Sequence, residues 1–140
     1  MNGNSDCKGK GMKAYLAHGG AIKERGKQLQ VKLEALGFEV LNPFVIVNQS
    51  VASSSMVEKE LRTIEGSDIL VAIVTPEARA THMEVFYSSR ILQHPTFVLY
   101  DTQVDPGRIF HPWYDYLTSV WGSESELLRA IQIWKNFQDE

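Results

Sequence analysis

The feature that most constrains the fold is a run of six consecutive apolar residues, Ile69 to Val74, which Pro76 brings to an end. A strand without polar residues is typical of the centre of a parallel sheet, where helices cover both faces. A sheet of this kind binds ligands in the crevice beyond the C-terminal ends of its strands. The run therefore predicts both the class of fold and the edge of the sheet at which a site would lie.

Segments of strand and helix character alternate along the rest of the chain. Strands are expected over residues 13–17, 38–41, 69–74, 96–100 and, at the edge of the sheet, 116–121. Helices are expected over residues 21–36, 56–66, 80–93 and 123–137, with loops over residues 44–55 and 102–112. The alternation predicts an α/β fold: a single-domain, flavodoxin-like, doubly wound parallel sheet of about five strands with helices on both faces.

Residues that cap or end helices agree with these bounds. Gly37 and Gly66 follow the first two helices, and one of the serines at 53–55 is expected to cap the second helix. Ser123 precedes the last helix and forms a capping box with Glu126.

Composition limits the classes of protein to which the chain can belong. At 140 residues, with 44% hydrophobic residues, residues 13–140 are expected to form one domain behind a flexible glycine-containing tail, residues 1–12. A net charge of −3 without a basic stripe argues against a nucleic-acid polymer as partner. No apolar run approaches the roughly 20 residues that a membrane span needs. An ordinary soluble protein is the class that fits these numbers.

The N-terminus and the metal-binding residue types lead to further expectations. The start of the chain is polar rather than apolar, and the single cysteine, Cys7, has no internal partner, so a cytoplasmic setting is expected. Four scattered histidines show no metal-ligand spacing, so no metal is expected. No phosphate-binding loop rich in Ser, Thr and Gly follows the first strand. Flavin mononucleotide is therefore disfavoured, and no cofactor is expected.

Several polar residues follow the first and third strands, which are neighbours in a flavodoxin-like sheet. Tyr15 lies in the first strand, and its phenol could reach a ligand or pack as a half-buried side chain. The turn His18-Gly19-Gly20 leads into a helix N-terminus, which favours an anion, although glycine pairs also serve tight turns for their shape alone. Lys23 and Arg79 are candidate cations for a phosphate, or solvent-facing charges.

Two glutamates occupy helix positions that face the sheet or its edge. Glu60 falls within the apolar stripe of Val57, Leu61 and Ile64, where a carboxylate is costly unless it is paired or functional. Glu84 lies in the first turn of the helix after the apolar strand, three residues after Thr81. A Glu in a first turn can also simply complement the helix dipole. On that helix, Ala80, Tyr87 and Ile91 are expected to mark the inward side.

These residues resemble the nucleoside 2-deoxyribosyltransferase family, whose superfamily includes nucleoside 5′-monophosphate N-glycosidases. The resemblance rests on Tyr15-Leu16-Ala17 before a glycine turn, on the segment from Ser67 to Ala72, and on Thr81-x-x-Glu84, and it extends over about residues 13–100. The chain departs from the family in having Ala80 in place of glycine before the threonine, Ala78 in place of a polar residue, and Glu60 in place of aspartate.

The resemblance implies a function and a role for each matching residue. Glu84 would be the nucleophile that attacks C1′ of the sugar, Tyr15 would hydrogen-bond and orient Glu84, and Glu60 would bind sugar hydroxyls. The sequence itself marks no residue as the acid that protonates the leaving base: Asp101, after the fourth strand, lies at the correct edge of the sheet but could equally cap a loop. The family is generally oligomeric, so a homodimer or larger homo-oligomer is expected. The expected substrate is a nucleoside or its 5′-monophosphate, with a preference for the monophosphate.

Other functions are compatible with the same residues. One is a nucleotide-binding or sensing module of the same fold that has lost turnover. Another is a flavodoxin-like partner protein without a small ligand. The aromatic residues Phe110, Trp113, Tyr114, Tyr116 and Trp121 could stack on a nucleobase, but packing of a helix or of a subunit interface is expected more often of such a cluster. His82 is expected to be a solvated helix residue.

Overall fold

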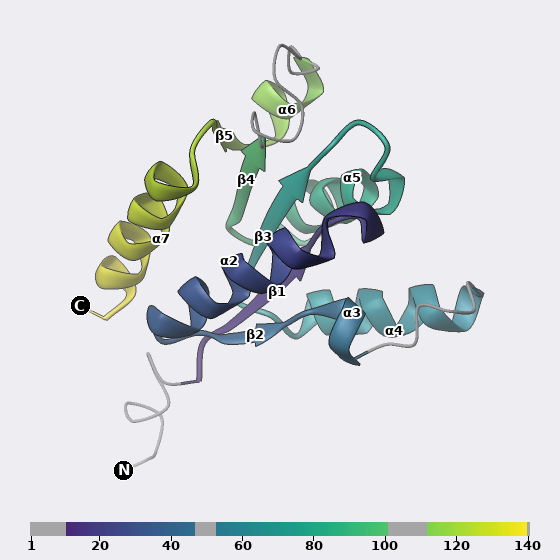
Figure 1. Ribbon diagram of the computed structural model, residues 1–140, viewed down its shortest axis with the longest axis horizontal. Helices are drawn as coiled ribbons and strands as arrows, with labels where there is room; N and C mark the ends of the chain where they lie inside the picture. Colours follow the sequence, from purple (N-terminus) through teal and green to yellow (C-terminus); the bar gives the residue numbers. More distant parts are fainter. Residues whose placement is uncertain (1–10, 47–52, 101–111, 140) are drawn as a thin grey trace.

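A five-stranded, all-parallel sheet with the strand order β2-β1-β3-β4-β5 forms the centre of the structure, which is a computed structural model (Figure 1). The structure describes residues 11–46, 53–100 and 112–139. The strands are β1 (Lys13–Ala17), β2 (Glu39–Leu41), β3 (Ile69–Val74), β4 (Thr96–Tyr100) and β5 (Ser119–Trp121). This order is that of the flavodoxin-like sheet, so the predicted fold class is confirmed. From β1 the chain runs to β2 on one side and then returns to β3 on the other side of β1. At such a switch point, between β1 and β3, a crevice is expected beyond the C-terminal ends of the strands.

Helices cover both faces of the sheet (Figure 1). The helical elements in chain order are η1 (Gly20–Ile22), α2 (Lys23–Ala35), α3 (Pro43–Ile46), α4 (Ser54–Glu65), α5 (Arg79–Phe86), its π-helical continuation η2 (Tyr87–Ile91), α6 (Pro112–Leu117) and α7 (Glu124–Gln138). One core cluster joins a face of the sheet to α2 and α7, and the other joins the opposite face to α4, α5 and α6. The predicted helices therefore form, with small changes in their bounds.

Alternation along β1 and β3 decides which side chains face the second core. Ala14 and Leu16 of β1 pack toward α2 and α7, whereas Tyr15 and Ala17 pack toward α4 and α5. All six residues of β3 are buried, as the apolar run predicts. Because Glu60 lies on α4 and Glu84 on α5, the direction in which Tyr15 points brings its phenol to the same side of the sheet as both carboxylates.

The expected cap residues lie where the sequence places them. The Ser53 hydroxyl accepts a hydrogen bond from the Met56 amide at 3.2 Å, and the Ser123 hydroxyl accepts one from the Glu126 amide at 3.2 Å. Gly37 has a φ of 101°, a backbone conformation that favours glycine after a helix.

Two expected segments differ from the structure. Residues 43–46 form the short helix α3 where a loop is expected, because the Asn42 side chain accepts a hydrogen bond from the Phe44 amide at 2.9 Å and starts a turn. Tyr116 and Leu117 are helical in α6 rather than part of the edge strand, which begins only at Ser119. Pro112 opens α6, a position that suits proline, and the helix overrides the strand propensity of the aromatic residues.

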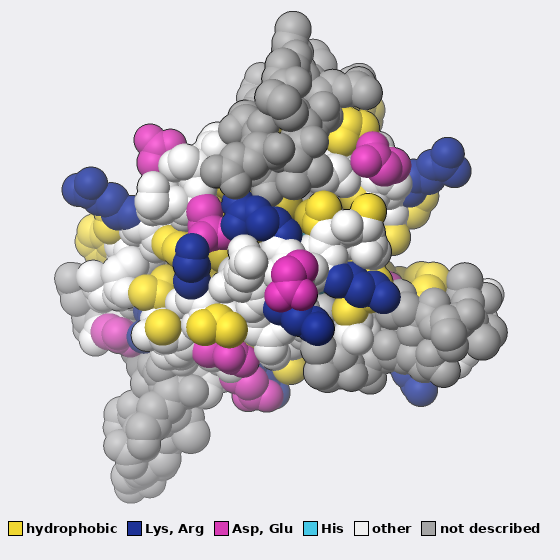
Figure 2. All heavy atoms as spheres, in the orientation of Figure 1, with side chains coloured by type: hydrophobic (Ala, Val, Ile, Leu, Met, Phe, Trp, Pro, Cys, Tyr) yellow, Lys and Arg dark blue, Asp and Glu magenta, His cyan; other side chains and the backbone are white. Residues whose placement is uncertain are grey.

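Two kinds of feature are absent from the described residues. No helix among them is long and apolar enough to cross a membrane. Within the same residues, no group of three or more His, Cys, Asp or Glu side chains could hold a metal ion. On the face shown in Figure 2, basic and acidic side chains of the described residues are interspersed.

Candidate functional site

A cavity of about 230 Å³ opens beside the switch point of the sheet. Its wall comes from the turn after β1, from α3 and α4, and from the segment between β3 and the second turn of α5. Among its lining residues are seven that the sequence singles out: His18, Gly19, Gly20, Glu60, Arg79, Thr81 and Glu84. Residues from four separate parts of the chain therefore meet at the edge that the strand pattern predicts.

A buried hydrogen bond links Tyr15 to Glu84 at the base of this cavity. The phenol of Tyr15 donates to Oε2 of Glu84 at 2.7 Å. Tyr15 has no exposed surface and does not line the cavity, whereas Glu84 is 9% exposed and does. Burial, together with the charge of Glu84, raises the pKa of Tyr15 far above its ordinary value, so the phenol keeps its proton and acts only as a donor. Tyr15 thus fixes the carboxyl of Glu84 from behind.

Glu60 is a second carboxyl group in the lining of the cavity and affects Glu84. Glu60 is 8% exposed and lines the cavity, whereas Glu58, its neighbour on α4, points into solvent. Burial raises the pKa of Glu84 to about 7; the hydrogen bond from Tyr15 opposes the rise, and the charge and hydrogen bonding of Glu60 add to it. The carboxyl of Glu84 therefore keeps its proton to a higher pH than a carboxyl in water does.

The inward face of α5 differs from the expected one. Thr81, Glu84, Val85 and Ser88 are buried, whereas Ala80 and Ile91 are exposed, so the expected inward side was wrong at those two residues. The face is the ordinary helical one with spacings of three and four residues. Two of its residues, Thr81 and Ser88, carry hydroxyl groups, so a search for apolar residues does not find them.

Gly19 and Ala78 bring the two sides of the cavity close together. A Cβ atom at Gly19 would lie 3.1 Å from the Cβ of Ala78. A larger side chain at either position would therefore push the turn after β1 away from the segment before α5. The glycine at 19 has a packing role here, apart from any role in binding an anion.

His18 forms a wall of the cavity by packing. Its ring stacks on Phe44, with ring centroids 4.7 Å apart, and Nδ1 donates to the Gly19 carbonyl at 2.8 Å. Burial lowers the pKa of His18, so the ring is neutral at physiological pH. A Cβ atom at Gly26 would lie 2.2 Å from Nε2, so the far side of the ring rests against helix α2.

Replacing Gly26 by alanine is expected to destabilise the fold, although alanine is the better helix former. Alanine at an ordinary helix position adds about 1 kcal/mol of stability relative to glycine. Here the added methyl group meets the His18 ring and must displace it and its stacking partner Phe44, and overpacking of this kind costs about 1–3 kcal/mol. Chemical denaturation measures the change. Greater stability in Gly26→Ala than in the wild type would show that His18 is not held in this position.

The candidate cations and Asp101 have different surroundings. Arg79 lines the cavity and is exposed, and Lys23 lies at its margin with Nζ 5.4 Å from the centre of the Phe44 ring. Arg25, which flanks Lys23, instead pairs with Glu124 of α7 at 2.7 Å and is turned away from the cavity. Asp101 lies outside the described residues.

Sequence reasoning missed several residues of the cavity wall: Pro43, Phe44, Met56 and Glu77. Pro43 and Phe44 follow the C-terminal end of the second strand, the end of the sheet at which the site was expected. Their position could have indicated them, but the segment was expected to be an irregular loop. Met56 precedes Glu60 by one helical turn, and the same spacing could have identified it.

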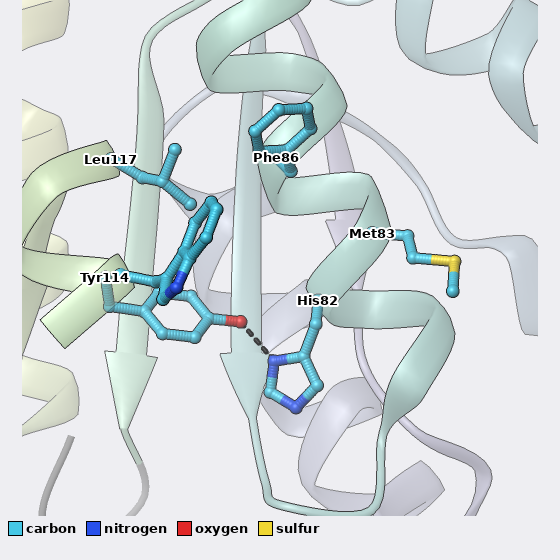
Figure 3. A pocket seen from close by; sticks show the side chains of 6 residues that line it. His82, Met83, Phe86, Tyr114 and Leu117 are labelled. Atoms are coloured by element: carbon cyan, nitrogen blue, oxygen red, sulfur yellow. Dashed lines mark hydrogen bonds between the residues drawn. The ribbon is translucent and has the colours of Figure 1, made fainter. Parts of the chain in front are cut away.

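A larger groove of about 480 Å³ lies on the outer side of α5, between that helix and α6 (Figure 3). It is lined by His82, Met83, Phe86, Trp113, Tyr114 and Leu117. None of these described lining residues carries a carboxylate, whereas the chemistry expected of the site needs one. The cavity that contains Glu60 and Glu84 is the candidate site despite its smaller volume.

The aromatic cluster and His82 lie at this groove or in the core. Tyr114 is buried, Trp121 stacks on Phe97 with ring centroids 5.7 Å apart, and Trp113 and Tyr116 are exposed. None of these four described aromatic residues lines the cavity with Glu84, and Phe110 lies outside the described residues. The expectation that His82 is solvated is wrong, because its ring is half-buried and makes two hydrogen bonds.

Solved structures with the same fold include two nucleoside-processing enzymes. A 2-deoxyribosyltransferase from the psychrotolerant bacterium Bacillus psychrosaccharolyticus matches with a TM-score of 0.64 at 19% identity, over 86% of this chain and 90% of the other. A 2-deoxyribosyltransferase from Leishmania mexicana matches with a TM-score of 0.58 at 16% identity, over 87% of this chain and 97% of the other. No family model and no curated protein sequence matches. The resemblance to deoxyribosyltransferases is therefore confirmed for the fold.

Proposed function

We propose that this chain cleaves or transfers the N-glycosidic bond of a nucleoside, a deoxynucleoside or one of their 5′-monophosphates, with Glu84 as the nucleophile. The observation that carries the proposal is the buried Tyr15–Glu84 hydrogen bond at the wall of a cavity. The deoxyribosyltransferases of the same fold add support. A carboxylate that is buried, oriented by a neutral donor and still open to a cavity suits attack on a sugar carbon.

The first chemical step follows from the position of Glu84. Its ionised carboxylate attacks C1′, the bond from C1′ to the base nitrogen breaks, and the electron pair stays on the base. Positive charge develops on the sugar, and a nearby carboxylate stabilises this charge more strongly in a buried site than in water. Tyr15 keeps its proton throughout and holds the attacking carboxyl in one orientation. The product of the step is a glycosyl ester on Glu84.

Glu60 is the second carboxyl group in the lining of the cavity, where a proton can be exchanged with the reacting groups. The base that departs with the electron pair takes up a proton from water. The Glu60 carboxylate can then accept a proton from a water molecule that attacks C1′, which completes hydrolysis. A second base in place of water gives transfer. The oxygen of Glu60 that is not engaged in proton transfer can accept a hydrogen bond from a sugar hydroxyl.

The 5′ end of the substrate would face the remaining polar wall. Backbone amides at Gly19 and Gly20 and the side chains of Lys23 and Arg79 are the groups that would contact a 5′-phosphate. Thr81 is 1% exposed and would contribute a hydroxyl beside Glu84. These groups can serve a nucleoside hydroxyl or a phosphate, so the proposal includes both substrates.

A chromatographic screen for free base tests the proposal. The purified chain is incubated with each common ribonucleoside, deoxyribonucleoside and 5′-monophosphate, with and without an acceptor base. Release or exchange of a base by the wild type supports the proposal, and the pattern of substrates shows the preference for sugar and phosphate. No release from any of them would contradict it.

A nucleotide-binding module without turnover is the second candidate function. The observation that favours it is the start of α5, where the N-cap residue Ala78 makes no side-chain cap and Ala80 occupies the position at which the deoxyribosyltransferase family has glycine. Thermal stabilisation by a nucleotide without any product would support this function over catalysis.

We further propose that the chain forms a homodimer or larger homo-oligomer through the groove between α5 and α6. Met83, Phe86, Ile91, Trp113 and Tyr116 are exposed large hydrophobic residues on these helices and on η2. At about 150–250 Å² per large side chain, they leave roughly 500 Å² exposed on each copy. Two copies would bury about 1,000 Å² together, the size at which specific interfaces begin.

Replacing Phe86 by glutamate is expected to make the chain monomeric, because the new charge would be buried between two copies. Light scattering after gel filtration measures the mass. Val31→Glu is the matched control, since Val31 is an exposed apolar residue on α2. If the wild type is itself a monomer, or if Phe86→Glu keeps the wild-type mass, the groove is not the contact between copies.

A further inference from the structure

The ring of His82 lies between helix α6 and the end of strand β3, which are far apart in the sequence. One ring nitrogen, Nδ1, is hydrogen-bonded to the hydroxyl of Tyr114 on α6 (Figure 3). The other, Nε2, is 3.0 Å from the backbone carbonyl oxygen of Thr75, the residue that follows β3. The ring is half-buried at the head of the groove, on the side of α5 that faces away from Glu84.

The partners of the ring determine which nitrogen carries the proton. A carbonyl oxygen only accepts hydrogen bonds, so Nε2 carries a hydrogen and donates it to Thr75. In the neutral ring Nδ1 then accepts the Tyr114 hydroxyl hydrogen. Tyr114 is 8% exposed, and burial raises its pKa above the ordinary value, so its hydroxyl keeps the proton that it donates. Both hydrogen bonds therefore fit a single neutral tautomer of His82.

The carbonyl of Thr75 lies at the start of the segment that forms one wall of the cavity. It also accepts a hydrogen bond from the Ala78 amide at 3.2 Å, and Thr75 itself is buried. Glu77, Ala78 and Arg79 follow directly and line the cavity. The orientation of the Thr75 peptide therefore sets where this wall stands relative to the turn after β1, which approaches it at Gly19.

Helix α5 needs such a support because its start has no side-chain cap. The N-cap residue, Ala78, cannot accept a hydrogen bond from the first turn of the helix, whereas Ser, Thr, Asp or Asn would. His82, in the first turn, reaches back past the N-cap to Thr75 and so fastens the turn to the strand that precedes it. The buried Tyr114 in turn fastens the ring of His82.

We propose that His82 is a positioning residue for the candidate site: through Thr75 and Tyr114 it holds the segment from Thr75 to Arg79 and the first turn of α5 against the cavity. For catalysis this rests on the proposed function, because the consequence for turnover presumes that Glu84 and Thr81 act on a substrate. A displacement of about 1 Å in a catalytic site can reduce the rate about a hundredfold, so loss of this support would lower turnover without contact to the substrate.

Three variants separate the effect of the hydrogen bonds from that of the ring's bulk. His82→Ala removes both bonds, Tyr114→Phe removes only the bond to Nδ1, and His82→Gln keeps one donor and one acceptor. His94→Gln is the matched control. His94 is also half-buried, but it precedes β4 and so lies at the N-terminal ends of the strands, whereas the cavity lies beyond their C-terminal ends.

The first measurement is amide hydrogen exchange of each variant without any ligand. His82→Ala is expected to speed exchange at residues 77–82 by about tenfold or more while residues 69–74 of β3 exchange as in the wild type. His82→Gln is expected to return most of the protection, Tyr114→Phe to lie between, and His94→Gln to have no effect on residues 77–82. Unchanged exchange at residues 77–82 in His82→Ala, or an equal rise across the whole sheet, would overturn the proposal.

The second measurement is turnover of whichever nucleoside or nucleotide the wild type cleaves fastest. His82→Ala is expected to lower kcat/KM at least about tenfold, with partial rescue in His82→Gln. An unchanged kcat/KM would overturn the positioning role. A wild type that cleaves nothing would contradict the proposed function, and the exchange experiment would then still decide whether His82 holds this segment.

Discussion

Replacing Glu84 by glutamine is expected to lower base release by about a thousandfold or more, because the amide cannot form the glycosyl ester that the carboxylate forms. The change is nearly isosteric, and the side-chain carbonyl of glutamine can still accept the hydrogen bond from Tyr15 that the structure shows at 2.7 Å. The cavity wall is therefore expected to keep its shape. Steady-state rates on the best substrate of the wild type measure the loss, and circular dichroism shows that the variant is folded.

Glu58→Gln is the matched control for this variant. Glu58 is a carboxylate on α4 with 72% of its side chain exposed, and it lies outside the cavity. Its replacement is expected to leave the rate unchanged. If Glu84→Gln also retained the wild-type rate, Glu84 would not be the nucleophile, and the Tyr15–Glu84 pair would have to be regarded as a structural feature of the core.

The parts of the fold that could be predicted from the sequence are those that local patterns determine. The apolar run of β3 and the caps at Ser53 and Ser123 are confirmed, because burial of a central strand and capping of a helix depend on neighbouring residues in the chain. The region of α6 was predicted wrongly at Tyr116 and Leu117. There the strand propensity of aromatic residues conflicts with a helix that tertiary contacts select, and a local pattern cannot decide between them.

The candidate site divides in the same way. Glu60 and Glu84 could be identified because a carboxylate on the sheet-facing side of a helix contradicts the pattern around it. His82 could not, because its two partners, Thr75 and Tyr114, lie 7 and 32 residues away in the chain. Its environment exists only after α6 packs beside α5. The raised pKa of Glu84 also needed the structure, since it depends on the burial of its carboxyl and on the nearness of Glu60, not on their spacing in the sequence.

The wild-type chain is expected to lose stability as the pH rises from about 4.5 to about 7, and Glu84→Gln is expected to lack this loss. In the unfolded chain Glu84 ionises with an ordinary pKa of 4.5, whereas in the folded chain burial and Glu60 raise its pKa to about 7. The contribution is fully present below the unfolded pKa. Between the two values the unfolded chain has released the proton and the folded chain has kept it, so the free energy of unfolding falls, by roughly 3 kcal/mol at most.

Denaturant titrations of both proteins at pH 5 and pH 8 measure this contribution as a difference, in which the titration of other groups such as His18 cancels. Between pH 5 and pH 8 the free energy of unfolding of Glu84→Gln is expected to rise relative to that of the wild type. At pH 8 the variant, which lacks the nucleophile, would then be the more stable protein. Such a result would mean that the fold tolerates an unfavourable buried carboxylate at the site, as expected of a residue kept for chemistry rather than for packing. Parallel curves for the two proteins would show instead that Glu84 ionises with its ordinary pKa in the folded chain.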